Sequence, residues 1–145
     1  MKKRLALFLA TGFFVGYFPF AAGTLGTILG VFIYWVFGGY LLLSLLLSFL
    51  LSLWSIKQTS SLLEEDDPKI VIDEITGFLV TMLFLPPNWE YILAGFILFR
   101  IIDILKPYPI NKIEGISSPW GVVLDDVAAG AMSCLLLHGV RYIFG

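Results

Sequence analysis

Long apolar runs separated by short polar stretches dominate this sequence of 145 residues. No charged side chain occurs between Leu5 and Ile56, and two later apolar runs end at prolines, Pro86 and Pro107. The residue before a proline rarely continues a helix, so each of these prolines indicates a helix end. A membrane-spanning helix needs about 20 mostly apolar residues. The pattern therefore predicts helices packed in a membrane rather than a soluble domain.

The apolar runs predict the following elements. They are a short segment at 5–18, a pair of runs at 24–37 and 40–56, and three helices at about 68–85, 88–105 and 119–142. Gly38 and Gly39 can form a tight turn within the pair. The first segment is interpreted as a re-entrant or interfacial helix, with a short span as the alternative. We therefore expect an all-α fold in a single domain, residues 1–145: a polytopic membrane helical bundle of about four to five membrane helices plus this short N-terminal helix.

Composition agrees with this expectation. The chain is 59% hydrophobic and 14% charged, whereas soluble domains carry about 25% charged residues. Cys134 and His138 are the only residues of their types, and we interpret both as packing residues of one apolar helix. A single cysteine excludes a disulfide framework. The lone cysteine and the lack of a histidine pair argue against cysteine-phosphatase and zinc-hydrolase chemistry.

The charged residues predict an orientation. If the apolar runs cross the membrane in turn, one side receives these basic loop residues: Lys57, Lys69, Lys106 and Lys112. The other side receives only Arg141, so the first side is expected to be cytoplasmic. The basic N-terminus, Lys2–Arg4, fits the same side only if the first segment does not span. The acidic run at 64–67 is interpreted as a solvated loop.

Five carboxylates are expected near this membrane boundary, each within apolar sequence: Asp73, Glu74, Asp103, Asp125 and Asp126. Charges inside a bilayer are usually paired, bound to metal or facing water. Neighbouring residues on a helix diverge by about 100°, so we expect one acid of each adjacent pair to serve as a ligand. Oxygen ligands without histidine or cysteine suit Mg²⁺, with Mn²⁺ as an alternative. Ion pairs with basic residues explain the acids equally well.

Basic residues beside these acids indicate anion binding. Arg100 and Lys106 flank Asp103 on one helix face, and the planar fork of Arg100 suits phosphate. The alternative for Arg100 is a salt bridge to Asp103. Thr24 lies at an expected helix start, where it would cap the helix and where free N–H groups attract anions. An anion beside a metal suits phosphoryl hydrolysis, because the metal activates water and neutralises charge.

Four blocks occur together and in order: GTLGT (Gly23–Thr27), IVIDEITG (Ile70–Gly77), FRIIDILKPYPI (Phe99–Ile110) and GVVLDDVAAG (Gly121–Gly130). With them the chain resembles the phosphatidylglycerophosphatase A family, small membrane-embedded, Mg²⁺-dependent lipid phosphatases. Two departures are visible. Ala22 stands where the family usually has proline, and SSPWG at 117–121 replaces a glycine-rich stretch. Neither departure removes a charged residue of the blocks.

The resemblance implies hydrolysis of phosphatidylglycerophosphate to phosphatidylglycerol and phosphate, for phospholipid biosynthesis at the cytoplasmic side of the bacterial inner membrane. It implies Mg²⁺ as cofactor and lipids, not nucleic acid, as partners. The metal ligands would be Asp73, Glu74, Asp103 and Asp126. Asp125 would be a further catalytic acid, and Arg100, Lys106 and Thr24 would hold the phosphate. A metal-activated water is the expected nucleophile.

Two other classes of protein are considered. A transporter or proton-coupled carrier would use intramembrane acids as relay groups, but the internal repeats typical of such folds are not visible. A CDP-alcohol phosphotransferase is also acid-rich and membrane-bound, but its long aspartate motif is missing from this sequence.

Overall fold

Helices make up the regular structure of the computed structural model, which describes residues 1–64, 66–117 and 119–145. In chain order they are α1 (Lys2–Ala10), the 3₁₀ turn η1 (Val15–Tyr17), α2 (Ala22–Phe37), the 3₁₀ turn η2 (Gly38–Tyr40), α3 (Leu41–Thr59), α4 (Ile72–Thr81), α5 (Trp89–Leu105), α6 (Ile110–Ile113) and α7 (Trp120–Phe144). The all-α prediction is confirmed. Part of the acidic run, Glu65, lies outside the described residues, as does Ser118 of the SSPWG stretch.

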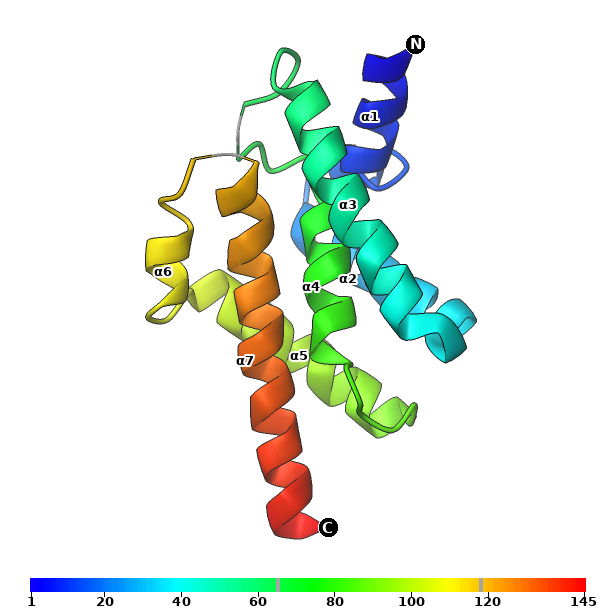
Figure 1. The fold of residues 1–145 in the computed structure, drawn as a ribbon, viewed down its shortest axis with the longest axis vertical. Helices are drawn as coiled ribbons and strands as arrows, with labels where there is room; N and C mark the ends of the chain where they lie inside the picture. The colour runs from blue at the N-terminus through cyan, green and yellow to red at the C-terminus, as the bar shows by residue number, and fades with distance from the viewer. Residues whose placement is uncertain (65, 118) are drawn as a thin grey trace.

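Among the described residues, two helical stretches are long and apolar enough to cross a membrane, residues 22–59 and 120–144. The first comprises α2 and α3, between which the chain reverses at η2, as the two glycines predicted (Figure 1). One face of α3 is apolar and at least half exposed, through Leu42, Leu43, Leu46, Leu47 and Leu50. A continuous exposed apolar face of this kind marks a surface that contacts lipid or another apolar partner.

The short helix α4 lies at the centre of the bundle, in contact with α2, α3, α5 and α7 (Figure 1). Small residues allow these contacts. A Cβ on Gly26 would lie 2.7 Å from the Cβ of Val71, and a Cβ on Gly30 would lie 3.2 Å from that of Phe78. A Cβ on Gly77 would lie 2.6 Å from the ring of Phe99. The close packing places the first turn of α4 beside the functional residues of its neighbours.

The helix α4 is shorter than the sequence predicted. It begins at Ile72 rather than Pro68, because the N–H of Val71 donates to the carbonyl of Ala10 at 2.9 Å instead of joining a helix. It ends at Thr81, before the left-handed residue Phe84. The prediction of helix to about residue 85 is therefore wrong.

The N-terminal helix α1 does not cross the bundle. Its nine residues span about 13 Å at 1.5 Å per residue, against about 30 Å for a hydrocarbon core. It packs beside α3, and Lys3 Nζ donates to Ser61 Oγ at 2.9 Å. Helix α1 alone is therefore too short to cross a membrane, which disagrees with the short-span alternative.

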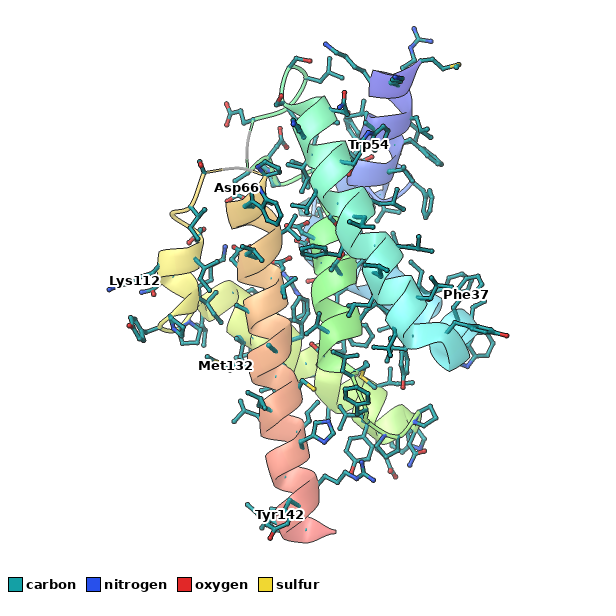
Figure 2. All side chains as sticks on the ribbon, viewed as in Figure 1. Phe37, Trp54, Asp66, Lys112, Met132 and Tyr142 are labelled. Atoms are coloured by element: carbon teal, nitrogen blue, oxygen red, sulfur yellow. The ribbon has the colours of Figure 1, made fainter. Side chains whose placement is uncertain are left out.

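The ends of the helices divide into two groups. The starts of α2, α4 and α7 lie with the end of α5, whereas η2 and the Pro86–Pro87 turn lie away from them. In Figure 2, Asp66 lies towards the upper left and Lys112 at the left, whereas Phe37 lies towards the right and Tyr142 towards the bottom. This arrangement brings the four sequence blocks together at one end of the bundle. That this end faces the cytoplasm stays a prediction.

Candidate active site

Three carboxylates from two helices form the centre of the site. Asp73 and Glu74 belong to the first turn of α4 and Asp126 to the second turn of α7. Each offers one oxygen, and these atoms lie within 4.8 Å of one another. Asp73 and Asp126 are buried and Glu74 is partly buried. The free N–H groups and dipole at the start of α4 favour negative charge there.

The cluster contains buried oxygens without hydrogen-bond partners in the described part of the chain. They are Asp73 Oδ1, Glu74 Oε2 and Asp126 Oδ2. Burying polar atoms without partners costs free energy, and grouped carboxylates repel one another. A divalent cation with oxygen ligands would relieve both costs, and Mg²⁺ and Mn²⁺ prefer such ligands. The donor set therefore fits the cation that the sequence indicated.

The two adjacent acid pairs differ in arrangement. We expected only one member of each to face the centre. Asp125 and Asp126 do diverge, since Asp126 joins the cluster and Asp125 Oδ2 accepts a hydrogen bond from Lys106 Nζ at 2.8 Å. Asp73 and Glu74 both face it. The additional methylene of Glu74 gives its carboxylate the reach to offset the angle between neighbouring positions.

Arg100 is paired with an acid of its own helix. Its Nη1 donates to Asp103 Oδ2 at 2.5 Å, one turn further along α5. The salt bridge, one of the two alternatives left open by the sequence, is thus present. Asp103 is not among the three clustered carboxylates, but its side chain neighbours that of Asp126. Arg100 keeps a buried Nε without a partner in the described residues.

Lys106 joins three parts of the site. It is the left-handed residue that ends α5, and its Nζ donates to Asp125 Oδ2 at 2.8 Å and to Glu114 Oε1 at 2.9 Å. Burial alone would lower the pKa of Lys106, but these two ion pairs outweigh burial and raise the pKa above its ordinary value. The amine therefore stays protonated at neutral pH.

Glu114 was not among the residues that the sequence indicated. It follows α6, a short helix anchored by the buried Ile110. The sequence did not predict α6, because the two prolines before it indicated the end of a helix. The only signal was a lysine and a glutamate eight residues apart on either side of the prolines. That spacing has no regular geometry, so sequence reasoning could not pair the two.

The start of α2 lies against the acids. Ala21, with a left-handed φ of 51°, precedes the helix, and Thr24 lies inside its first turn. The prediction that Thr24 caps α2 is therefore wrong. A Cβ on Gly23 would lie 2.6 Å from Glu74 Oε1 and 3.1 Å from Arg100 Nη2. Glycine at this position lets the helix N-terminus approach both charged groups.

Fold and site together define a helical membrane protein with a buried carboxylate centre that could hold a divalent cation. The chain belongs to the phosphatidylglycerophosphatase A family, whose model matches residues 8–141. This membership makes the protein a phosphatase. The transporter alternative has no support among the comparisons.

Curated relatives match nearly the full chain. A putative phosphatidylinositol-3-phosphatase of Bacteroides thetaiotaomicron is 35% identical, over 97% of this chain and 96% of that protein. The phosphatidylglycerophosphatase A of Escherichia coli is 33% identical, over 99% and 88%. That of Haemophilus influenzae is 36% identical, over 92% and 87%. No solved structure matches the chain.

Proposed function

We propose that this protein hydrolyses phosphatidylglycerophosphate to phosphatidylglycerol and phosphate, with Mg²⁺ as cofactor, in phospholipid biosynthesis. The observation that carries the proposal is the cluster of Asp73, Glu74 and Asp126, with buried oxygens that lack partners in the described residues, in a chain of this family. Mn²⁺ is the alternative cofactor, since it accepts the same oxygen ligands.

The four carboxylates that we assign to the metal site are supported by different observations. Asp73, Glu74 and Asp126 would hold the cation directly. Asp103 is the fourth acid that we assign to the centre, since it neighbours Asp126 and also fixes Arg100. A bound Mg²⁺ supplies a Lewis acid for phosphoryl oxygen and water.

The basic residues would bind the phosphate and orient the other groups. Arg100 lies next to the start of α2, so its guanidinium and the first amides of that helix would bind the same phosphate. Thr24 would add its hydroxyl or amide from the same turn. Lys106 adds positive charge and holds one oxygen of Asp125. The other oxygen, Oδ1, has no partner in the described residues, so Asp125 is the acid that we assign to accept a proton from the attacking water.

The site is proposed to lie on the cytoplasmic side of the bacterial inner membrane, in a multi-pass protein. The same end of the bundle as the cluster also holds the loop and helix-end lysines Lys57, Lys69, Lys106 and Lys112. Excess lysine and arginine in loops marks the cytoplasmic side. The substrate would enter from that leaflet.

The test is phosphate release by the purified protein in detergent micelles. Phosphatidylglycerophosphate should release phosphate with Mg²⁺ and stop on addition of chelator. Phosphatidylinositol 3-phosphate is the competing substrate, because the relative from Bacteroides thetaiotaomicron is named a putative phosphatidylinositol-3-phosphatase. Failure to release phosphate from phosphatidylglycerophosphate, or faster release from the inositol lipid, would overturn the proposed substrate.

A further inference from the structure

A cavity of about 280 Å³ adjoins the start of α2. Its walls are residues 16–19 and 21–22, between η1 and the first residue of α2, and the pair Pro68–Lys69 from the loop before α4. We call this cavity the Lys69 pocket. None of the charged residues assigned above to metal or phosphate lines it, and it shares only the first turn of α2 with the proposed phosphate site.

The walls of the Lys69 pocket are held in place by backbone contacts. A Cβ on Gly16 would overlap the carbonyl oxygen of Lys69, so the two wall segments meet backbone to backbone. The Gly16 N–H donates to the Thr11 carbonyl at 2.9 Å, and the Ile70 N–H donates to the Asp67 carbonyl at 2.9 Å. The pocket is therefore formed before any ligand arrives.

The Lys69 pocket carries positive charge that its neighbours only partly neutralise. Lys69 Nζ lies 3.6 Å from Asp67 Oδ1, longer than a charge-assisted hydrogen bond. That carboxylate oxygen already accepts the Lys69 backbone N–H at 2.9 Å. The Lys69 side chain is 43% exposed. Ala22 adds the N-terminal turn of α2, whose free N–H groups favour an anion.

The pocket and the carboxylate centre share one helical turn. Ala22 lines the pocket, and the next residue, Gly23, lies against Glu74 and Arg100. A ligand with two anionic groups a short distance apart can therefore occupy both. The proposed substrate has that form, because one glycerol unit separates its terminal phosphomonoester from the phosphodiester that leads to the acyl chains.

We propose that the Lys69 pocket binds the phosphodiester of the lipid headgroup, with Lys69 as its cationic partner, while Arg100 holds the terminal phosphate. This inference rests on the proposed function. Tyr17 lines the pocket and is about half exposed, and tyrosine side chains favour the membrane interface. Lys69 is thus a specificity residue that distinguishes this lipid from simple phosphomonoesters.

The experiment compares wild type with Lys69→Gln in mixed micelles. Loss of one charge-assisted contact should raise the KM for phosphatidylglycerophosphate about tenfold, with kcat within about twofold. The inhibition constant of phosphatidylglycerol, which keeps the diester but lacks the terminal phosphate, should rise by the same factor. The inhibition constant of inorganic phosphate should not change, because free phosphate occupies only the terminal site. Lys69→Arg should restore both lipid constants.

Four outcomes would overturn the inference. They are an unchanged KM, an equal rise in the inhibition constant of inorganic phosphate, failure of Lys69→Arg to restore the constants, and the same KM increase in Lys57→Gln. Lys57 is the matched control, an exposed lysine in the last turn of α3, and it measures general attraction between surface charge and lipid.

A binding measurement separates this inference from the proposed function. Phosphatidylglycerol is titrated into wild type and Lys69→Gln in detergent, with diacylglycerol as the lipid without phosphate. About tenfold weaker binding of phosphatidylglycerol to the variant supports the Lys69 pocket even if wild type hydrolyses no phosphatidylglycerophosphate. Equal binding to both proteins overturns it.

Discussion

Gly130 on α7 meets Gly77 on α4 backbone to backbone, so closely that a Cβ on Gly130 would overlap the carbonyl oxygen of Gly77. The contact lies one turn beyond both functional segments, since Asp126 precedes Gly130 by four residues and Asp73 precedes Gly77 by four. The separation of the two helices at this point therefore determines how far apart the two acids lie.

Gly130→Ala should destabilise the protein and reduce its activity. The new methyl group meets backbone rather than a movable side chain, and overpacking of this kind costs about 1–3 kcal/mol. Thermal unfolding in detergent and phosphate release would measure the two effects. Gly139→Ala is the matched control on the same helix, because its Cβ would meet no described atom within 4 Å. Equal behaviour of the two variants would contradict the prediction.

Gly23→Ala should impair activity more than stability. Its Cβ would meet the flexible ends of Glu74 and Arg100, which can move aside but then leave their positions in the site. We expect at least about a tenfold loss in kcat/KM, the rate equivalent of about 1.4 kcal/mol. Gly39→Ala, in the distant turn η2, has open space around its Cβ in the described residues and should behave as wild type. A normal kcat/KM for Gly23→Ala would show that the start of α2 takes no part in the reaction.

Asp126→Asn should separate stability from activity. Without Mg²⁺ the substitution removes one carboxylate from a cluster of three that repel one another when ionised, so the free energy of unfolding should rise. Wild type should gain about 2.7 kcal/mol when Mg²⁺ is at a hundred times its Kd, and the variant should lose this gain together with phosphate release. Melting curves with Mg²⁺ and with chelator test both statements.

The exposed Asp66→Asn provides the control for Asp126→Asn, since it changes the same charge outside the cluster. It should keep both the activity and the stabilisation by Mg²⁺. If Asp126→Asn kept them as well, the assignment of Asp126 to the metal would fail.

The two acids that bind Lys106 should contribute unequally to stability. The Asp125 side chain is 5% exposed and that of Glu114 is 44% exposed. Lys106→Gln leaves Asp125 as an uncompensated buried charge and should cost about 3–5 kcal/mol. Glu114→Gln removes an exposed partner and should cost at most about 1 kcal/mol. Unfolding in detergent would measure both values, and similar losses would contradict a buried role for the Lys106–Asp125 pair.

The sequence predicted the features that depend on periodicity and composition. The apolar runs predicted the helices, and Gly38 and Gly39 predicted the reversal between α2 and α3. Because successive helices run in opposite directions, the helix ends that carry Asp73, Asp103 and Asp126 were expected in one region. These predictions succeeded because the direction of each helix follows from the order of the helices along the chain and does not depend on how their side chains pack.

Features that depend on side-chain reach and on tertiary hydrogen bonds could not be predicted. The start of α4 is set by the bond from Val71 to Ala10, residues 61 positions apart. Helix geometry alone did not place both Asp73 and Glu74 at the cluster, although the family resemblance named both as ligands. Glu114 reaches Lys106 only through the fold of the α6 segment. Local sequence contains no trace of such contacts.

The short helix α1 has a consequence for labelling experiments. Because α1 is too short to cross the bundle, Met1 lies at the end of the molecule where α3 finishes, whereas Gly145 lies at the opposite end of the molecule, where α7 finishes (Figure 1). In the proposed multi-pass topology, reporter proteins fused to the two termini would therefore fall in different compartments. The probe is a fluorescent protein that matures in the cytoplasm but not after export through the general secretory route. With the proposed cytoplasmic side for the site, the N-terminal fusion should fluoresce and the C-terminal fusion should not.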